Sequence, residues 1–440
     1  MSQLADLIQS AADWLFVPVL VVVLFGTGIF LTVRLGFVQV RRLGEAVSEF
    51  LGGRTRTGTG GALTPFQAFM TALAATIGTG NIAGVAAGIV SGGPGVLFWI
   101  WCYGFFATSI KFSEAVLGLS FRQSRGDDVQ SGPMYYLRDG LKSPGMAMAY
   151  AVVAGIAALT TTPFTQTNSI ALVMNTQVGV PFWISGVVVA VLTWLVIIGG
   201  IKSIGRAAEK LAPLKVGLFL LGALVVIVSF AGNIPSVLAL VFREAFTVNS
   251  ALGFGIFTAM RYGLARGLYA NEAGYGTAAV AYGTAQSDRP AQQGLNAVME
   301  VFIVSFGTCT LTALTVLLTG AWQSGQTSTA AVALAFNAAM PGFGGYVVAF
   351  CVFLFGYTTL IGWGFYGEQF LEYWLGKRVV VPYRWAYCLL IPFGAIAKVN
   401  LVWAWGDLMN ALQIFPNLLG VVALSGLAAK AAYDTSRSKP

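Results

Sequence analysis

The chain has 440 residues, of which 57% are hydrophobic and 10% are charged, and it contains no histidine. Soluble domains carry about 25% charged residues, so this composition excludes a water-soluble protein and predicts one integral membrane domain over 1–440. The missing histidine excludes Ser-His-Asp triads, histidine-ligated metals and histidine proton relays. The net charge of +8 does not indicate nucleic acid binding, because membrane orientation explains it better.

Eleven segments are long and apolar enough for transmembrane helices, which need about 20 mostly apolar residues. In chain order they cover about 14–33, 63–90, 95–121, 145–176, 182–200, 213–231, 250–277, 295–320, 343–371, 383–400 and 404–428. The segment 34–60 mixes charged and apolar residues, which predicts an amphipathic helix on the cytoplasmic membrane surface. A second short surface helix is expected at 235–248. Residues 321–342 are expected to form a loop, and 429–440 a polar cytoplasmic tail.

The distribution of lysine and arginine along the chain predicts its orientation in the membrane. With the N-terminus outside, 20 of the 25 positive residues fall in cytoplasmic segments, and Lys215 is counted among them. Only Arg243 and Lys398 then fall on the outer side. The positive-inside rule therefore predicts a multi-pass protein of the cell membrane, with its C-terminus in the cytoplasm.

The first interruption of a membrane helix lies in the segment 63–90. Its middle reads Ile77-Gly78-Thr79-Gly80-Asn81. Unwound backbone at this depth is tolerated only where it lines a protein cavity. The free amides of one half-helix suit a carboxylate, and the free carbonyls of the other suit a cation. The alternative is close helix packing through the glycines spaced by four residues at 80, 84 and 88.

A second glycine-rich interruption follows in the segment 250–277, about 185 residues later. Six glycines punctuate it: Gly253, Gly255, Gly263, Gly267, Gly274 and Gly276. A pair of interrupted helices at corresponding positions is typical of inverted repeats. The sequence therefore predicts an all-α protein with two inverted five-helix repeats, 63–231 and 250–428. The segment 14–33 is then an extra N-terminal helix.

Polar residues at membrane depth form two further clusters. The first runs from Thr160 to Asn168 around Pro163 and includes Gln166; it serves either interhelical hydrogen bonds or substrate contacts, with Phe164 as an apolar wall. The second contains the pair Thr358-Thr359. These hydroxyls either bond to the preceding helical turn or donate oxygen to a hard cation. Trp363 follows near the same helix face and is suited to cap a small cavity.

Charged residues within the predicted spans are the last group: Lys111, Glu114, Arg261, Arg266, Glu272, Glu300 and Glu368. Lys111 and Glu114 are spaced for an ion pair, and Arg266 and Glu272 lie near the second break. We expect these four residues to form structural or gating ion pairs rather than to carry protons. If the coupling ion were a proton, Glu272 would be the first carboxylate to test.

Five motifs resemble the alanine or glycine:cation symporter family, and the resemblance covers about 60–440. They are TALAATIGTGNIAGVAAGI (71–89), SGGPGVLFWIW (91–101), SGPMYYL (131–137), RGLYANEAGYGTA (266–278) and QGLNAVMEVFIVSFGTCTLTAL (293–314). The family belongs to the amino acid–polyamine–organocation superfamily. The resemblance therefore implies the leucine-transporter-type fold.

The resemblance also implies two sets of site residues. The substrate carboxylate is expected on the amides of the first break, at Thr79, Gly80 and Asn81. The third and sixth helices are expected to add Phe164, Gln166, Asn168, Gly255 and Thr258, while Trp363 joins the expected substrate residues through its place on the helix face described above. The glycines of 250–277 offer two registers, so Gly255 and Thr258 represent one of two alignments. The sodium site is expected at the carbonyls of Ala74, Ile77 and Phe355 and the hydroxyls of Thr358 and Thr359.

Together these patterns predict a secondary active symporter that couples inward sodium flow to uptake of alanine or glycine. Its expected partners are that amino acid, Na⁺ and the lipid bilayer, with no cofactor, nucleic acid or obligate protein partner. A proton-coupled symporter or an amino acid exchanger of the same fold is the alternative. A membrane enzyme is disfavoured because the sequence has no nucleophile–base set. A channel would give unsaturable flux instead of saturable uptake.

Overall fold

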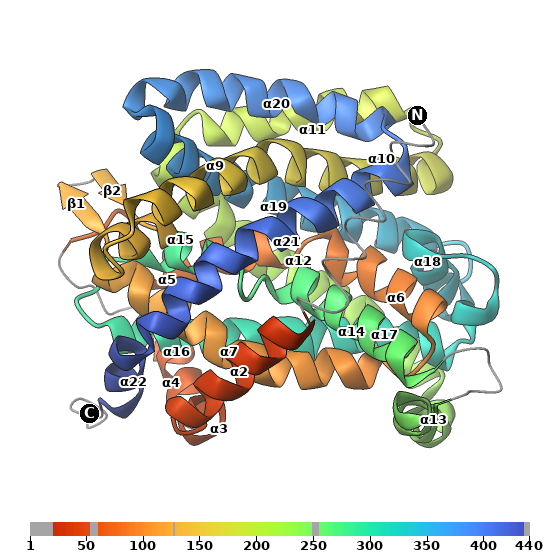
Figure 1. Ribbon diagram of the computed structural model, residues 1–440. Helices are drawn as coiled ribbons and strands as arrows, with labels where there is room; N and C mark the ends of the chain where they lie inside the picture. The colour runs from red at the N-terminus through yellow and green to blue at the C-terminus, as the bar shows by residue number, and fades with distance from the viewer. Residues whose placement is uncertain (1–20, 53–59, 126–127, 249–254, 435–440) are drawn as a thin grey trace.

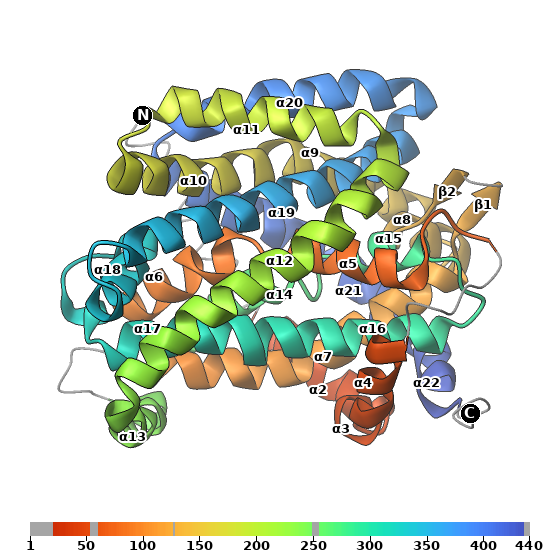
Figure 2. The same ribbon diagram turned by 180° about the vertical axis from the view of Figure 1, so that it is seen from behind.

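In the computed structural model, the described residues are 21–52, 60–125, 128–248 and 255–434. They are mostly helical, as Figures 1 and 2 show. The paired strands of the described part are β1 (Gln123–Arg125) and β2 (Asp128–Gln130), which form a short antiparallel hairpin. The prediction of an all-α chain is therefore confirmed apart from this hairpin.

Six helical segments of the described residues are long and apolar enough to cross a membrane, and two bent pairs raise the number to as many as eight. The six are α7 (Val96–Ser120), α9–α10 (Pro144–Thr160, Thr162–Val178), α12 (Gly200–Ser229), α16–η5–α17 (Pro290–Val301, Phe302–Thr308, Cys309–Leu318), α19 (Gly344–Leu375) and η7–α20 (Lys377–Val379, Val380–Ile396). The bent pairs are α5 (Pro65–Thr76) with η2–α6 (Thr79–Asn81, Ala83–Gly92), and α21 (Val399–Ala423) with α22 (Ser425–Tyr433). The predicted number of eleven is not reached by this criterion.

Two of the remaining predicted spans, 14–33 and 182–200, correspond to shorter apolar helices, α2 (Val21–Arg34) and α11 (Phe182–Ile197). A third short apolar helix, α18 (Ser328–Ala339), was not predicted. Residues 14–20 of the first predicted span lie outside the described residues. The segment 321–342 was expected to be a loop, but it contains the short 3₁₀ helix η6 (Ala321–Gln323) and α18.

The segment 250–277 corresponds to α14 (Ile256–Asn271) and the start of α15 (Thr277–Gly283). Its Gly253 lies outside the described residues, as do residues 435–440 of the predicted tail.

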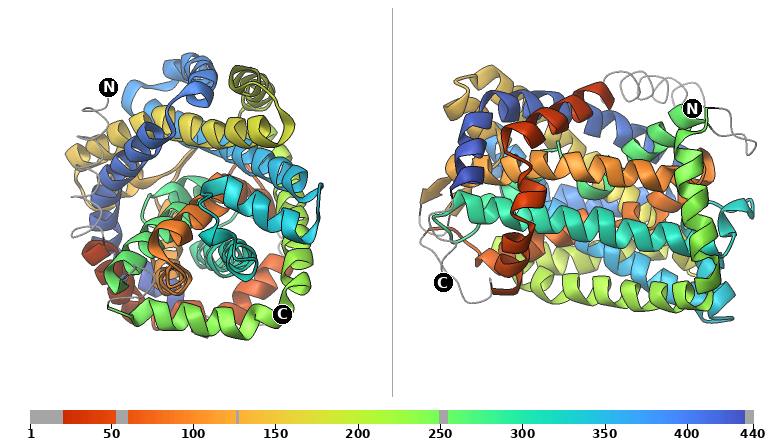
Figure 3. Two further views of the ribbon diagram at one scale, coloured as in Figure 1. Left: turned by 90° about the vertical axis from the view of Figure 1, so that its right-hand side faces the viewer. Right: turned by 90° about the horizontal axis from the view of Figure 1, so that it is seen from below.

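Helices occur in both segments for which surface helices are predicted. The segment 34–60 contains α3 (Val38–Arg41) and α4 (Leu43–Gly52), while 53–59 lie outside the described residues. The second surface helix follows the short 3₁₀ helix η4 (Ala231–Asn233) and is α13 (Ile234–Phe246), which runs across the ends of the long helices in Figure 3. A short helical stretch, α8 (Pro133–Tyr135) and η3 (Tyr136–Gly140), connects the hairpin to α9.

The surface of the helix bundle is apolar, as a lipid-facing surface must be. On α12, Leu221, Leu224 and Val228 are 64%, 41% and 71% exposed. On α11, Val191 and Leu195 are 53% and 64% exposed. Contiguous exposed apolar surface of this kind is rare on soluble proteins. It identifies the sides of the bundle as the face that contacts the bilayer.

The two interrupted helices lie inside the bundle, surrounded by the long helices (Figure 3). Helices at matching positions of the two halves of the chain pack against each other: α7 against α16, α10 against α19, and α11 against α20. The broken pair α5–α6 packs against α12, α14, α18 and α19. The breaks are therefore held at the centre of the molecule.

Local sequence explains the first break. Thr64 caps α5 in a capping box with Gln67, and Pro65 occupies the first helical position. The helix stops at Ile77, and Gly78 takes an extended conformation with φ −111° and ψ −168°. The chain then bends by 60° into α6. The prediction of broken backbone in 63–90 is confirmed.

The glycines of 250–277 allow two positions for the second break, and the structure has the later one. It falls after α14, where Glu272, Gly274 and Gly276 have positive φ values of 57°, 102° and 83°. Glycine adopts this left-handed region without strain, whereas Glu272 is one of the uncommon non-glycine residues there. Gly255, by contrast, precedes the first turn of α14 at its opposite end.

Candidate substrate and cation sites

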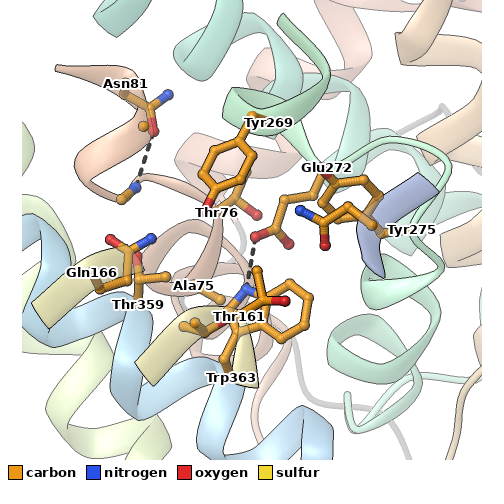
Figure 4. A pocket seen from close by; sticks show the side chains of 14 residues that line it. Ala75, Thr76, Asn81, Thr161, Gln166, Tyr269, Glu272, Tyr275, Thr359 and Trp363 are labelled. Atoms are coloured by element: carbon orange, nitrogen blue, oxygen red, sulfur yellow. Dashed lines mark hydrogen bonds between the residues drawn. The ribbon is translucent and has the colours of Figure 1, made fainter. Parts of the chain in front are cut away.

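A small cavity lies between the two breaks. Figure 4 shows its wall, to which α5, the first break, α10, the second break, α19 and α21 contribute. The lining residues are Ala75, Thr76, Gly78, Gly80, Asn81, Thr161, Thr162, Gln166, Tyr269, Glu272, Tyr275, Thr359, Trp363 and Asn410. The free space among these side chains is about 20 Å³, close to the room that one water molecule needs, so an amino acid fits only when the wall opens.

Side-chain amides meet the free backbone amides of the first break. The Thr79 amide donates to Gln166 Oε1 at 2.9 Å, and the Gly78 amide donates to Asn81 Oδ1 at 3.0 Å. Asn81 is held in turn, because Thr312 Oγ1 donates to its carbonyl at 2.8 Å. The protein itself therefore supplies oxygen acceptors at the positive end of a half-helix, where a carboxylate is favoured.

The glycines of the first break permit close approach of other helices. A Cβ atom at Gly80 would lie 2.5 Å from Cδ1 of Tyr269, and one at Gly78 would lie 2.8 Å from Oγ1 of Thr359. Such distances are below any normal carbon contact. Hence any larger residue at these two positions would push apart the wall of the cavity.

Charged side chains form hydrogen bonds with the backbone groups that the second break leaves without helical partners. Glu114 Oε1 accepts from the amides of Gly274 and Gly276 at 2.9 and 3.1 Å. On the other side, Lys111 Nζ donates to the carbonyl of Asn271 at 2.6 Å, at the end of α14. The carboxylate thus meets the positive end of one half-helix and the ammonium the negative end of the other.

The ion pairs of this region differ from those expected. Lys111 pairs with Glu300 at 2.7 Å instead of with Glu114, and both partners are buried. Glu272 accepts from Trp363 Nε1 and Thr277 Oγ1, both at 2.8 Å, and not from Arg266. The guanidinium of Arg266 stacks over Trp403, 5.4 Å from the ring centroid. The expected pairing of Lys111 with Glu114 was wrong because the backbone amides of the second break bond to Glu114 and the carboxylate of Glu300 lies within reach of Lys111.

The oxygens expected to bind sodium converge between α5 and α19. Thr359 Oγ1 donates to the carbonyl of Ala74 at 3.3 Å, and Thr358 Oγ1 donates to the carbonyl of Phe355 at 3.1 Å. The ammonium of a lysine also contacts these oxygens. Lys215 Nζ of α12 donates to the carbonyls of Ala74 and Ile77 at 2.9 and 2.5 Å, and to Thr358 Oγ1 at 2.5 Å.

The assignment of Lys215 to a cytoplasmic segment was therefore wrong. Helix α12 begins at Gly200, well before the predicted start at 213, and the side chain of Lys215 is fully buried. The described residues contain no group of three or more cysteine, aspartate or glutamate side chains placed to hold a metal ion.

The sequence model of the sodium:alanine symporter family matches residues 1–439 of this chain. The chain belongs to the sodium:alanine symporter family. It is 38% identical to the sodium/alanine symporter AgcS of Methanococcus maripaludis, over 96% of this chain and 95% of that protein. It is 30% identical to a Bacillus subtilis protein named as a putative sodium/proton-dependent alanine carrier, YrbD, over 99% of this chain and 93% of that protein. As a member of this family of transporters, it is not an enzyme.

A solved structure shares the fold of this family member. The manganese transporter of Eremococcus coleocola superposes with a TM-score of 0.56 at 15% identity, covering 80% of this chain and 75% of that one. Identity this low shows the fold alone. It supports the expected leucine-transporter-type architecture for the symporter family member described here.

Four of the nine expected substrate residues line the central cavity: Gly80, Asn81, Gln166 and Trp363. Thr79 lies in the first break and contacts Gln166 through its amide. The other four do not line the cavity. Phe164 packs against Gly394 of α20, and Asn168 Nδ2 donates to the carbonyls of Gly394 and Ala397 at 3.2 and 2.9 Å. Gly255 and Thr258 lie at the far end of α14.

Sequence reasoning missed several lining residues, among them Thr76, Tyr269, Tyr275 and Asn410. Two of these lie in the motif RGLYANEAGYG, and the choice of the second break within that motif would have identified both. Glu272 and Thr359 were singled out for other roles and also line the cavity. Asn410 on α21 had no signal, because a single amide in an apolar segment is usually structural.

Proposed function

We propose that this protein is a secondary active symporter in which inward sodium flow drives uptake of alanine or glycine by alternating access. The observation that carries the proposal is the cavity between two broken helices, lined by the backbone of the first break and by Glu272. The amides of Gly78 and Thr79 and the carbonyls of Ala74 and Ile77 bond there to side chains of the protein. A zwitterion and a cation suit the same helix ends and would replace these side chains. Family membership supports the pairing of sodium with an amino acid.

The substrate carboxylate is assigned to the backbone of the first break at Thr79 and Gly80, where Gln166 now supplies the acceptor oxygen. The substrate ammonium is assigned to Gln166 and Glu272, whose oxygens line the same cavity. Trp363 and Tyr269 restrict the space left for a side chain. Small volume and paired charges therefore favour alanine or glycine over larger amino acids.

Sodium is assigned to the carbonyls of Ala74, Ile77 and Phe355 and the hydroxyls of Thr358 and Thr359. Hard cations bind oxygen ligands of this kind. Coupling follows if the ion joins α5, which belongs to the first repeat, to α19, which belongs to the second. Sodium bound there favours the conformation in which these two helices are in contact, and it shifts the population toward it.

The cation assignment is tested by Thr359→Ala in proteoliposomes. We expect the sodium concentration for half-maximal alanine uptake to rise about tenfold, equivalent to about 1.4 kcal/mol for the lost oxygen ligand. Thr319→Ala is the matched control, because this hydroxyl bonds to the Thr315 carbonyl of its own helix. An unchanged sodium dependence in Thr359→Ala contradicts the assignment.

The domain organisation proposed is a single transporter domain with repeats 63–231 and 250–428 and an additional helix at 14–33. The packing of α7 on α16, α10 on α19 and α11 on α20 supports it, because a two-fold axis brings equivalent helices together. The orientation proposed has the N-terminus outside and the C-terminus in the cytoplasm. The excess of positive charge in the segments then facing the cytoplasm supports it.

The second candidate function is a proton-coupled symporter or an exchanger of the same fold. The buried carboxylates Glu114 and Glu272 favour it, because intramembrane carboxylates serve as proton carriers in many transporters. The relative named as a sodium/proton-dependent carrier also supports it. Uptake driven by an imposed proton gradient without sodium would establish proton coupling, and counterflow without any ion gradient would establish exchange.

A further inference from the structure

Lys215 is a buried cation that the proposed symport mechanism does not use. It lies on α12, which packs against both α5 and α19, and its side chain has no exposed surface. Its nitrogen reaches the carbonyls of Ala74 and Ile77 and the hydroxyl of Thr358 at 2.5–2.9 Å. These are three of the five groups assigned to sodium.

The geometry fits an ammonium. An ammonium carries three N–H donors, and three oxygens accept them here. No acidic side chain of the described residues forms a salt bridge with Lys215. Its charge is balanced instead by the carbonyls at the end of α5, which form the negative end of that half-helix. The ring of Phe355, with its centroid 5.4 Å from Nζ, adds a cation–π contact.

Sodium and this ammonium cannot occupy the oxygens together. Both are unit cations that need the same lone pairs, and in a buried site their repulsion is strong. We propose that Lys215 is a tethered competitor of sodium: its ammonium occupies the cation site of the ion-free carrier, and sodium binds only after the side chain withdraws. This inference rests on the proposed sodium site and adds a regulator to it.

The withdrawal requires a movement of the helices. The gap between α5, α12 and α19, which Ala74, Thr358, Leu211 and Ala208 line, leaves no space for a water-sized group in this conformation. A lysine stem has four rotatable carbons, so the ammonium can leave the oxygens once these helices separate.

The competition lowers the apparent sodium affinity in proportion to the fraction of time for which the site is free. If the ammonium occupies the oxygens nine-tenths of the time, its removal strengthens apparent sodium binding by about tenfold.

The test compares Lys215→Met with the wild type for sodium-dependent alanine uptake and for binding of ²²Na⁺ to purified protein. We expect the half-saturating sodium concentration to fall about tenfold. Lys210→Met is the matched control, because Lys210 lies on the same helix but is exposed. Lys215→Gln carries the same expectation, and the binding assay needs no transport activity. A half-saturating concentration equal to or above that of the wild type overturns the inference.

The two proposals fail in different ways. If wild-type uptake shows no sodium dependence, the proposed function fails. If the wild type depends on sodium and Thr359→Ala raises the half-saturating concentration, but neither Lys215 variant lowers it, only the tethered competitor is refuted.

Discussion

The buried pair Lys111–Glu300 gives the sharpest prediction about stability. Lys111 Nζ makes three hydrogen bonds: to Glu300 Oε1 at 2.7 Å, to the Asn271 carbonyl at 2.6 Å and to Thr76 Oγ1 at 3.2 Å. It therefore links α7 to α16, to the end of α14 and to α5. In Lys111→Met, Glu300 keeps only the hydrogen bond from the Tyr282 hydroxyl among those described for its side chain.

The magnitude follows from the burial of both partners, which are 1% and 0% exposed. Removing one partner of a buried ion pair costs about 3–5 kcal/mol, because the remaining charge stays uncompensated. We therefore expect Lys111→Met to lower the free energy of unfolding by about 3–5 kcal/mol. The double variant Lys111→Met/Glu300→Gln removes both charges and should recover at least about 2 kcal/mol of that loss.

The assay is unfolding of purified protein in mixed micelles with increasing denaturing detergent, for the wild type, both single variants and the double variant. Arg138→Met is the control, because the pair Arg138–Asp139 is 36% and 34% exposed and should contribute less than about 1 kcal/mol. A loss below about 1 kcal/mol in Lys111→Met, or additive effects in the double variant, would refute the reasoning.

Two further predictions concern the cavity and the orientation. Gly80→Ala places a Cβ 2.5 Å from the ring of Tyr269, whose hydroxyl donates to Thr165 at 2.9 Å. Overpacking of this kind costs about 1–3 kcal/mol, so alanine uptake by Gly80→Ala should fall at least about tenfold. The control Gly217→Ala has open space at its Cβ and should transport normally. Equal uptake in the two variants would contradict the cavity assignment. In a cysteine-free background, Ser324→Cys should react with an impermeant maleimide in intact cells and Lys142→Cys only after permeabilisation, and the reverse pattern would invert the proposed orientation.

Much of the architecture was predictable because the bilayer imposes it. Long apolar segments and the glycine-rich interruption at Ile77–Asn81 indicate a membrane bundle with a broken helix. The predicted positions of the helix ends were less accurate. The charged start of α12, from Lys202 to Lys210, falls in the loop predicted between the spans 182–200 and 213–231, because charge disfavours membrane helices. The helix nevertheless continues through it, since Lys215 finds oxygen partners in the interior.

The site was predictable where backbone chemistry defines it and less so where side chains meet across helices. Gly80, Asn81 and Gln166 belong to features that stand out in any apolar segment. The partners of Lys111 could not be inferred, because Glu300 is 189 positions away and only the tertiary fold brings it near. Asn168 shows the converse: a buried amide in a candidate segment serves helix packing on α20.

The most direct test of the central claim is uptake of labelled alanine and glycine into proteoliposomes under separately imposed sodium, potassium and proton gradients. We expect an inward sodium gradient alone to drive saturable accumulation of alanine or glycine above equilibrium, with no accumulation under potassium. Accumulation driven by a proton gradient in the absence of sodium, or no accumulation of either amino acid under a sodium gradient, would contradict sodium-coupled symport.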